Sequence, residues 1–292
     1  MLLHLLDKGV DPDNIHVHHN EVDGRGTSTF DWPCTTSYCR AVADHFGIRI
    51  IYSWREGGIK REIYRENEGL QDVLYEENGE LIRLQSRPGN STRRKFPAVA
   101  ADLRTRWCSS VVKIDVLSRV ITNHPEYQEG RFNIYSGERA QESANRAKYK
   151  DLEPYRSTSK KRVCTQVRPI LHWSEKEVWN IIGYHGIQPH PSYELGWGRC
   201  SCMTCIFSSP NTWATLFGFH PLAVDKIHTI ESEIQHTLYH GKTIGQKVDS
   251  GTPWTVDPYW VQQALGEFTA PMKPSRWRLP AGAFSNEKSG SV

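Results

Sequence analysis

Hydrophobic positions alternate between strand-like and helix-like spacing along the first part of the chain. Residues 15–19, Ile-His-Val-His-His, predict a short strand, and residues 35–46 have the spacing of a helix with one apolar face. Gly47 ends that helix, and the β-branched and aromatic run at 48–54 predicts a second strand. This order of strand, helix and strand predicts a parallel pair with a helix packed across it.

The pattern changes after residue 70 and later returns to helix and strand. An Asn-Gly pair at 78–79 stands between two strand-like runs within 70–85, which is a strong signal for a β-hairpin. We interpret this hairpin as an excursion from the α/β core. A helix is predicted over 109–123, a strand over 131–135, and mostly helix over 211–240. Ser174 with Glu177 predicts a capping box at the start of a further helix.

These elements predict an α/β fold with a mostly parallel sheet, helices on both faces, the hairpin excursion and a helical C-terminal part. We expect an α/β domain with a cysteine cluster at 1–206 and a helical region at 207–270. Residues 271–292, rich in Pro, Gly, Lys and Ser, are predicted to form a flexible tail.

Composition narrows the class of protein. The chain of 292 residues is 38% hydrophobic and 24% charged, which is typical of a soluble globular protein. No apolar run approaches the roughly 20 residues that span a bilayer. A net charge of +3 is too small to indicate nucleic-acid binding by itself. The seven cysteines are irregularly spaced, which argues against a secreted disulfide framework, and we expect a cytoplasmic location.

Three of the seven cysteines fall within six residues: Cys200, Cys202 and Cys205. The Cys202-x-x-Cys205 spacing is the usual half-site for zinc or an iron–sulfur cluster, and it is also the spacing of a redox dithiol. A four-ligand site needs thiols from elsewhere. Cys108 is the best candidate partner, and Cys200 is a candidate fourth ligand.

Cys108 stands in the sequence Arg-Trp-Cys-Ser at 106–109, five residues before Lys113. A nearby cation lowers the pKa of a thiol, and the thiolate is the form that binds metal or attacks sulfur. Cys108 and Lys113 are therefore candidate catalytic residues. A solvated basic surface is the alternative interpretation for the neighbouring basic run at 93–95.

The loop after the predicted strand 131–135 is a candidate anion site, because ligands of open α/β sheets bind beyond the carboxyl ends of strands. Arg139 and Arg146 are seven apart, so on a helix they would share one face and suit a phosphate or sulfate ester. The alternative is an exposed helix start with charge pairs to Glu138 and Glu142. The candidate nucleotide- or phosphate-binding residues are Ser136, Gly137, Arg139, Ser143 and Arg146.

Together these residues resemble the phosphoadenosine-phosphosulfate reductase family, within the adenine-nucleotide alpha-hydrolase superfamily. The matching motifs follow family order and are Trp32-Pro-Cys-Thr, Arg106-Trp-Cys-Ser with Lys113, Ser136-Gly-Glu-Arg139 with Glu142-Ser143 and Arg146, Arg168-Pro-Ile, Trp173-Ser-Glu-x-Glu-Val-Trp179, and His190-Pro-Ser-Tyr193 ahead of Cys202-x-x-Cys205.

Within the family the chain looks closest to the sulfur-transfer proteins of DNA phosphorothioation, the DndC and SspD type. That resemblance rests on the Arg-Trp-Cys-Ser block with its lysine and on the downstream Cys-x-x-Cys. Assimilatory reductases carry a catalytic cysteine near the C-terminus, whereas this sequence has no cysteine after Cys205.

The resemblance implies an ATP pyrophosphatase and sulfurtransferase that uses ATP with magnesium. An oxygen of the acceptor would attack the α-phosphorus, pyrophosphate would leave, and sulfur would then displace AMP. DNA is the implied acceptor, and a cysteine desulfurase and other sulfur-transfer proteins are the implied partners. An iron–sulfur cluster, with zinc as the alternative, would be held by Cys108, Cys200, Cys202 and Cys205.

The superfamily's phosphate loop, Ser-Gly-Gly-Lys-Asp-Ser after a first strand, has no counterpart here, because Met1 already begins the body of a predicted helix. We expect that the coding start lies further upstream; the alternative is that the loop has been lost. Three other functions stay open: an assimilatory sulfonucleotide reductase, a non-catalytic scaffold in a sulfur-transfer complex, and a zinc-stabilised nucleotide-binding protein.

Overall fold

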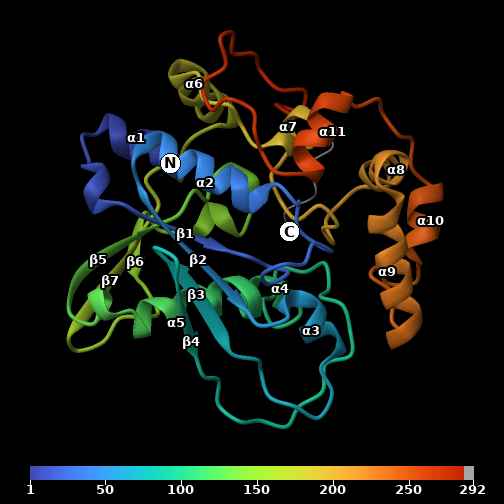
Figure 1. Ribbon diagram of the computed structural model, residues 1–292, viewed down its shortest axis with the longest axis horizontal. Coiled ribbons are helices and arrows are strands. Elements are labelled where there is room, and N and C mark those ends of the chain that lie inside the picture. Colours follow the sequence, from blue (N-terminus) through green and yellow to red (C-terminus); the bar gives the residue numbers. More distant parts are fainter. Residues whose placement is uncertain (286–292) are drawn as a thin grey trace.

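The first part of the chain forms a four-stranded mixed sheet. The computed structural model describes residues 1–285, and in it β1 (His16–Asn20) pairs in parallel with β2 (Arg49–Arg55). β2 pairs antiparallel with β3 (Val73–Glu77), which pairs antiparallel with β4 (Glu80–Leu84). The strand order is therefore β1-β2-β3-β4 (Figure 1).

A second sheet of three strands follows in the sequence. β5 (Gly130–Tyr135) pairs in parallel with β7 (Arg162–Val167), and β6 (Leu152–Pro154) pairs antiparallel with the other edge of β7. The carboxyl end of β5 leads directly into the loop that the sequence indicates as an anion site.

The α/β class is confirmed, but the prediction of one mostly parallel sheet is wrong, because both sheets are mixed. The predicted hairpin is present, and Asn78 and Gly79 take the positive φ values, 50° and 82°, that a tight hairpin turn needs. It is not an excursion. β3, the first strand of the hairpin, pairs along β2 and extends the sheet. The hairpin is therefore positioned by its pairing with the edge of the sheet.

Helices cover both faces of the first sheet. Figure 1 shows α2 (Thr35–Phe46) on one side and α5 (Asp115–Asn123) on the other, and both contact β1 and β2. Gly47 ends α2 in the left-handed conformation, with φ 64°, as its sequence position predicts. The other helical segments of this part are α1 (Leu2–Asp7), η1 (Pro12–Asn14), α3 (Gly58–Tyr64), α4 (Trp107–Ser109), the π-helical segment η2 (Ser110–Ile114), η3 (Pro125–Tyr127), η4 (Ala140–Glu142) and η5 (Arg146–Lys148).

The remainder of the chain is helical. The Ser174 side chain accepts a hydrogen bond from the backbone of Glu177, whose carboxylate bonds back to Ser174, so the predicted capping box starts α6. Prolines occupy the first turn of four of these helices, where their missing N–H has no cost. The helices are α6 (Glu175–His185), α7 (Pro191–Glu194), α8 (Pro210–Phe219), α9 (Pro221–Ile234), α10 (Ile244–Asp249) and α11 (Pro258–Leu265).

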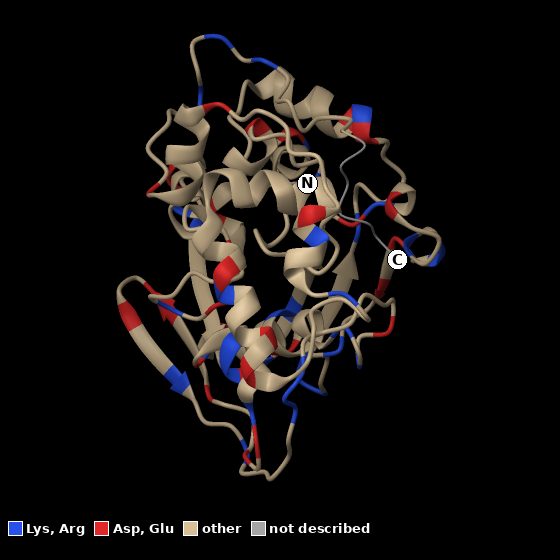
Figure 2. Ribbon diagram, turned by 90° about the vertical axis from the view of Figure 1, so that its right-hand side faces the viewer, with Lys and Arg blue, Asp and Glu red and all other residues tan. Residues whose placement is uncertain are grey.

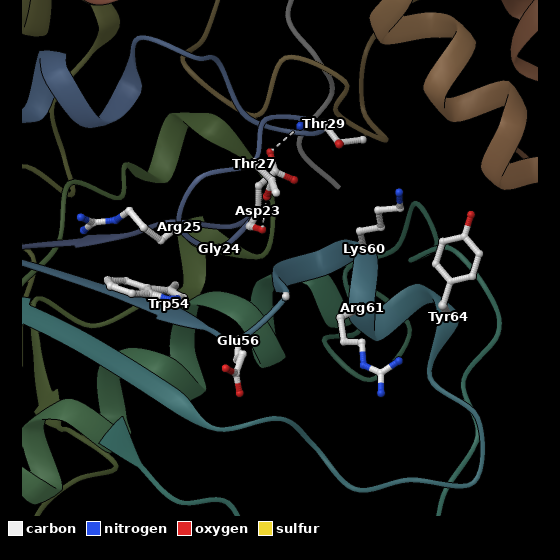
Figure 3. Close-up of a pocket in the computed structure, with 11 residues that line it drawn as sticks. Asp23, Gly24, Arg25, Thr27, Thr29, Trp54, Glu56, Lys60, Arg61 and Tyr64 are labelled. Carbon is white, nitrogen blue, oxygen red and sulfur yellow. Dashed lines mark hydrogen bonds between the residues drawn. The ribbon is translucent and has the colours of Figure 1, made fainter. Parts of the chain in front are cut away.

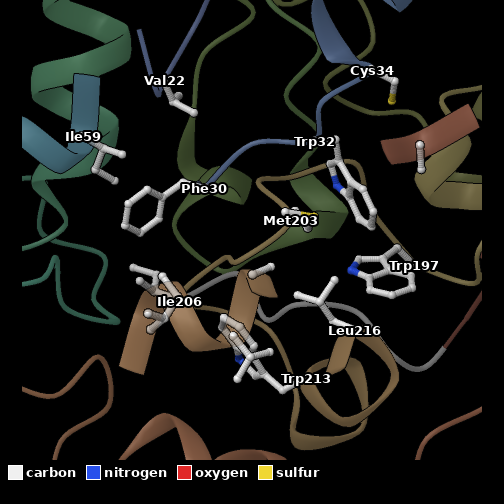
Figure 4. Packing of buried hydrophobic residues seen from close by; sticks show 14 of the residues in the cluster. Val22, Phe30, Trp32, Cys34, Ile59, Trp197, Met203, Ile206, Trp213 and Leu216 are labelled. Atoms are coloured by element: carbon white, nitrogen blue, oxygen red, sulfur yellow. The ribbon is translucent and has the colours of Figure 1, made fainter. Parts of the chain in front are cut away.

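The largest buried cluster joins the loop after β1 to the cysteine-rich stretch and to α8 and α9. Figure 4 shows part of it, with Phe30 and Trp32 from the loop around Met203, and Trp197, Trp213 and Leu216 beside them. Large aromatic side chains dominate this core because each buries much apolar surface. The cysteine-rich stretch is thus embedded in the main core.

The segment from 271 to 285 packs along α6. The indole of Trp277 lies against Gly183 and donates a hydrogen bond to the carbonyl oxygen of Ile187, 2.9 Å away. The amide of Gln188 donates to the carbonyl oxygen of Met272 at 2.8 Å. The predicted flexible tail therefore starts with residues that are held in place, and its last part, 286–292, lies outside the described residues.

Among residues 1–285, no helix combines the length and the apolar character that crossing a membrane requires. Figure 2 shows acidic and basic residues interspersed over most of the visible face, in keeping with the small net charge.

Candidate functional site

A sharp turn leads the chain into the cysteine-rich stretch. Gly196 has φ 97°, and a Cβ there would lie 2.8 Å from the indole nitrogen of Trp254. That nitrogen also donates to the carbonyl oxygen of Leu195 at 2.8 Å. Only glycine fits this turn, because both the backbone angle and the indole exclude a side chain.

The loop after β1 holds the cysteine-rich stretch in place. Trp32 donates from its indole to the carbonyl oxygen of Ser201 at 3.1 Å, and the amide of Thr204 donates to the carbonyl oxygen of Phe30 at 3.1 Å. The positions of Cys202 and its neighbours are therefore fixed by hydrogen bonds to a distant loop, one from a side chain and one between backbone groups.

Cys108, Cys202 and Cys205 pack against the same core cluster, and all three interact electrostatically with Lys113. We name these four residues the thiol centre. The negative charge of the Cys202 thiolate is the main cause of the raised pKa of Lys113, and the thiolates of Cys108 and Cys205 raise it further. Burial raises the pKa of Cys108 and of Cys202, whereas the Lys113 ammonium opposes both rises. The lysine is therefore the cation that favours thiolate at this centre.

Asp31 also belongs to this neighbourhood, which its place in the sequence did not indicate. Its Oδ1 accepts hydrogen bonds from the amide of Trp32 at 2.8 Å and from the hydroxyl of Thr35 at 3.2 Å. Burial raises the pKa of Asp31, and the Lys113 ammonium opposes the rise. The only sequence signal was an acidic residue between two large aromatics, Phe30 and Trp32.

Cys200 lies beside a second group of thiols. It keeps exposed surface, and burial of its thiol raises its pKa to about 12. Cys34 and Cys39 are its electrostatic neighbours. Cys34 is fully buried, with its sulfur 3.4 Å from Nε2 of His190.

No three His, Cys, Asp or Glu side chains within residues 1–285 converge closely enough to hold one metal ion. The four cysteines predicted as cluster ligands share one region but do not form a coordination shell. The structure therefore does not show a fit for a cluster. The assignment of Cys108, Cys200, Cys202 and Cys205 as ligands stays a prediction.

The candidate anion loop has a different local structure from the one predicted. No single helix carries Arg139 and Arg146, because η4 and η5 are separate turns. Both guanidiniums nevertheless reach the carboxylate of Glu142. A nitrogen of Arg139 lies 3.8 Å from a carboxylate oxygen, and Arg146 donates a hydrogen bond to the other oxygen. The charge pairing expected as the alternative is therefore present, and Glu142 occupies the position between the arginines that an anion would need.

The other predicted residues of this loop are also placed. Ser136 donates to the carboxylate of Glu138 at 2.9 Å, and Gly137 lies against Met1. The hydroxyl of Ser143 accepts from the amide of Arg146 at 3.3 Å. The loop is thus an ordered group of polar side chains at the carboxyl end of β5.

A cavity of about 540 Å³ lies at the carboxyl ends of β1 and β2. Figure 3 shows Lys60 extending from α3 toward the loop that carries Asp23 and Thr29. Asp23 Oδ2 accepts hydrogen bonds from the amides of Thr29, Phe30 and Asp31 at 2.8–2.9 Å, so the cavity wall and Asp31 belong to one loop. The sequence alone did not reveal this cavity, although Gly24 and Gly57, which follow β1 and β2 within a few residues, were a usable signal.

The chain belongs to the phosphoadenosine phosphosulfate reductase domain family, whose match covers residues 3–208. That range contains both parallel strand pairs, the anion loop and the thiol centre.

Two curated relatives are similar over shorter stretches. An uncharacterized 37.8 kDa protein of Escherichia phage 186 is 30% identical over 134 residues, 46% of this chain and 38% of the relative. The adenosine 5'-phosphosulfate reductase of Allochromatium vinosum is 28% identical over 98 residues, 34% of either chain. The chain thus spans little more than a third of the curated relatives it matches.

Proposed function

We propose that this chain transfers sulfur in a reaction that uses an adenine nucleotide, with the thiol centre as its sulfur-handling group. The observation that carries the proposal is the gathering of Cys108, Cys202 and Cys205 around Lys113. Membership of the reductase domain family supports the nucleotide part of the proposal.

In this proposal Lys113 favours the thiolate form, and a thiolate accepts sulfur from a donor persulfide. The bond from the donor sulfur to the transferred sulfur breaks, a new sulfur–sulfur bond forms on the cysteine, and the donor leaves as a thiol. No net oxidation or reduction occurs in this step. A protein persulfide, the product of a cysteine desulfurase, is the donor.

Arg139 and Arg146 are proposed to bind the phosphates of ATP, which would replace Glu142 between them. Two guanidiniums give charge-assisted hydrogen bonds to several phosphate oxygens and neutralise charge that builds during reaction. The cavity beside Lys60 is the proposed place for the acceptor, because its wall continues into the loop of Asp31.

As acceptor we propose a DNA backbone phosphate, as in the phosphorothioation proteins that the motifs resemble. An oxygen of that phosphate would attack the α-phosphorus of ATP, with release of pyrophosphate. The outer sulfur of the cysteine persulfide would then attack the DNA phosphorus and displace AMP. A second thiol of the thiol centre would attack the remaining sulfur–sulfur bond, which releases the phosphorothioate and leaves a protein disulfide for an added thiol to reduce.

The test supplies ATP with magnesium, DNA, a cysteine desulfurase, ³⁵S-cysteine and dithiothreitol to the full chain. Pyrophosphate release with label in the DNA supports the proposal. Absence of both excludes it for this chain.

The second candidate is reduction of adenosine 5'-phosphosulfate, which the similarity to the Allochromatium enzyme favours. Release of sulfite from that compound in the presence of thioredoxin, without pyrophosphate release from ATP, would select it. The iron–sulfur cluster stays part of the proposal as a hypothesis about the same cysteines. Iron and acid-labile sulfide in protein purified without oxygen would support it, and zinc without sulfide would support the alternative.

A further inference from the structure

The helical segment that carries Cys108 and Lys113 contains one turn of π-helix. α4, η2 and α5 follow one another without a break from Trp107 to Asn123, and the middle part, Ser110–Ile114, is π-helical. A π-helix closes its turn with hydrogen bonds between residues five apart, and such single turns often occur at functional sites.

This turn matters because Cys108 and Lys113 are five residues apart. In a regular α-helix their side chains would point about 140° away from each other, since each residue turns by about 100°. The π-helical turn, in which the amide of Asp115 donates to the carbonyl oxygen of Ser110, rotates less per residue and so brings the two side chains closer to one side. Val112 stays fully buried in the core, while Lys113 keeps exposed surface and adjoins the thiols.

Arg55, the last residue of β2, holds this turn from the sheet side. Its side chain has no exposed surface. Nε donates to the carbonyl oxygen of Val111 at 3.2 Å, and Nη2 donates to the carboxylate of Asp115 at 2.5 Å. Nη1 donates to the carbonyl oxygen of Gln71 at 2.6 Å. The guanidinium therefore contacts the chain on both sides of Lys113.

Stability alone does not explain this arrangement. Burial lowers the pKa of Arg55, and the carboxylate of Asp115 opposes that change. Desolvating a guanidinium is costly, and well-packed apolar side chains often stabilise a core as well as a buried ion pair does. The guanidinium fixes the geometry of the turn, because its planar group donates hydrogen bonds to a carbonyl and to a carboxylate in fixed directions.

We propose that Arg55 is a positioning residue, which holds the π-turn so that Cys108 and Lys113 face the same side. The use of this pair in sulfur transfer rests on the proposed function. The pairing itself does not, so its test involves neither nucleotide nor sulfur transfer.

The test uses disulfide formation with Cys108 in the full chain carrying Cys202→Ser and Cys205→Ser. In a regular helix, Cα atoms five residues apart are about 8.7 Å apart, which is beyond the reach of a disulfide, whereas those four apart are about 6.2 Å apart. Lys113→Cys is therefore expected to form a disulfide with Cys108 only if the π-turn exists. Val112→Cys is the positive control, and Ile114→Cys is the negative control. Peptide mass spectrometry after mild oxidation identifies the bonds.

Adding Arg55→Lys keeps a cation but removes the separate hydrogen-bond donors of the guanidinium. We expect it to lower the yield of the disulfide between Cys108 and Lys113→Cys. The yield of the disulfide with Val112→Cys should not change. Arg49→Lys, at the other end of β2, is the matched control. Should Arg55→Lys fail to fold, Asp115→Ala removes the outer anchor and is expected to give the same loss. The proposal is overturned if Lys113→Cys forms no more disulfide with Cys108 than Ile114→Cys does. It is also overturned if the disulfide yield of Lys113→Cys stays the same when Arg55→Lys or Asp115→Ala is added.

Discussion

The indole nitrogen of Trp32 donates a hydrogen bond to the carbonyl oxygen of Ser201, 3.1 Å away and 169 positions later in the sequence. This bond joins the loop that follows β1 to the stretch that carries Cys202 and Cys205. The thiol centre therefore depends on a contact between two segments that are far apart in the sequence.

Replacing Trp32 by phenylalanine removes this hydrogen bond and keeps most of the buried ring. We expect a loss of about 1 kcal/mol in the free energy of unfolding, the usual net value of such a bond, plus a smaller packing term. Trp32→Ala is expected to cost about 3–5 kcal/mol, because it also leaves a cavity. Urea unfolding measures both. Tyr184→Phe, at a side chain that is 84% exposed, is the control and should change stability by less than about 0.5 kcal/mol. Equal stability of Trp32→Phe and the parent would contradict the account.

Acid is expected to destabilise the fold through three histidines that are neutral when folded: His190 is buried, and His18 and His19 in β1 are partly buried. Burial lowers the pKa of His18 and of His19 to about 4 and that of His190 to about 3, from 6.5. Because the folded pKa lies below the unfolded one, the unfolded chain binds protons first. The stability is fully present above pH 6.5 and decreases as the pH falls toward 4, with up to about 2 kcal/mol lost per histidine by pH 5.

The variant His19→Gln isolates this effect. We expect the difference in unfolding free energy between pH 7.5 and pH 5 to shrink by up to about 2 kcal/mol relative to the parent. His240→Gln, at an exposed position, should leave the difference unchanged. An unchanged difference in His19→Gln would show that His19 does not titrate as its burial predicts.

Nucleotide affinity tests the anion loop. Arg139→Ala and Arg146→Ala should each weaken ATP binding by about tenfold or more, because a hydrogen bond to a charged group is worth about 1.5–3 kcal/mol. Titration calorimetry measures the affinity. Arg131→Ala, an exposed arginine of β5, is the matched control. If all three variants bind ATP as the parent does, the loop is only the charge pairing with Glu142 that the structure shows.

Metal content tests the predicted ligands. If a cluster or zinc is bound, Cys108→Ser and Cys205→Ser should each lose most of it, because thiolates are its ligands. Cys164→Ser should retain it, since Cys164 is buried in a different cluster of apolar side chains. Retention of metal in Cys205→Ser would exclude Cys205 as a ligand.

Local patterns in the sequence were sufficient for most elements. The apolar spacing of α2, the Asn-Gly turn and the Ser174 capping box each depend on neighbouring residues, and each is present in the structure. The pairing of strands is not local. The sequence could not show that β3 pairs along β2, because that depends on which sheet edge the hairpin buries.

The candidate site shows the same division. The spacing of Cys202 and Cys205 drew attention to the thiols, but the π-turn beside Cys108 has no sequence signature, because it depends on a buried arginine from another element. Asp31 was missed for the same reason. Its role follows from Lys113, which lies 82 positions later and becomes its neighbour only on folding.

The most direct test of the central claim is to locate sulfur on the protein itself. The full chain is incubated with a cysteine desulfurase and ³⁵S-cysteine, and the persulfides are trapped by alkylation and mapped by mass spectrometry. We predict label on Cys108, Cys202 or Cys205, and much less label in Lys113→Ala, with Cys164 unlabelled. Label spread equally over Cys164 and the thiol centre, or no label at all, would contradict the claim that this centre handles sulfur.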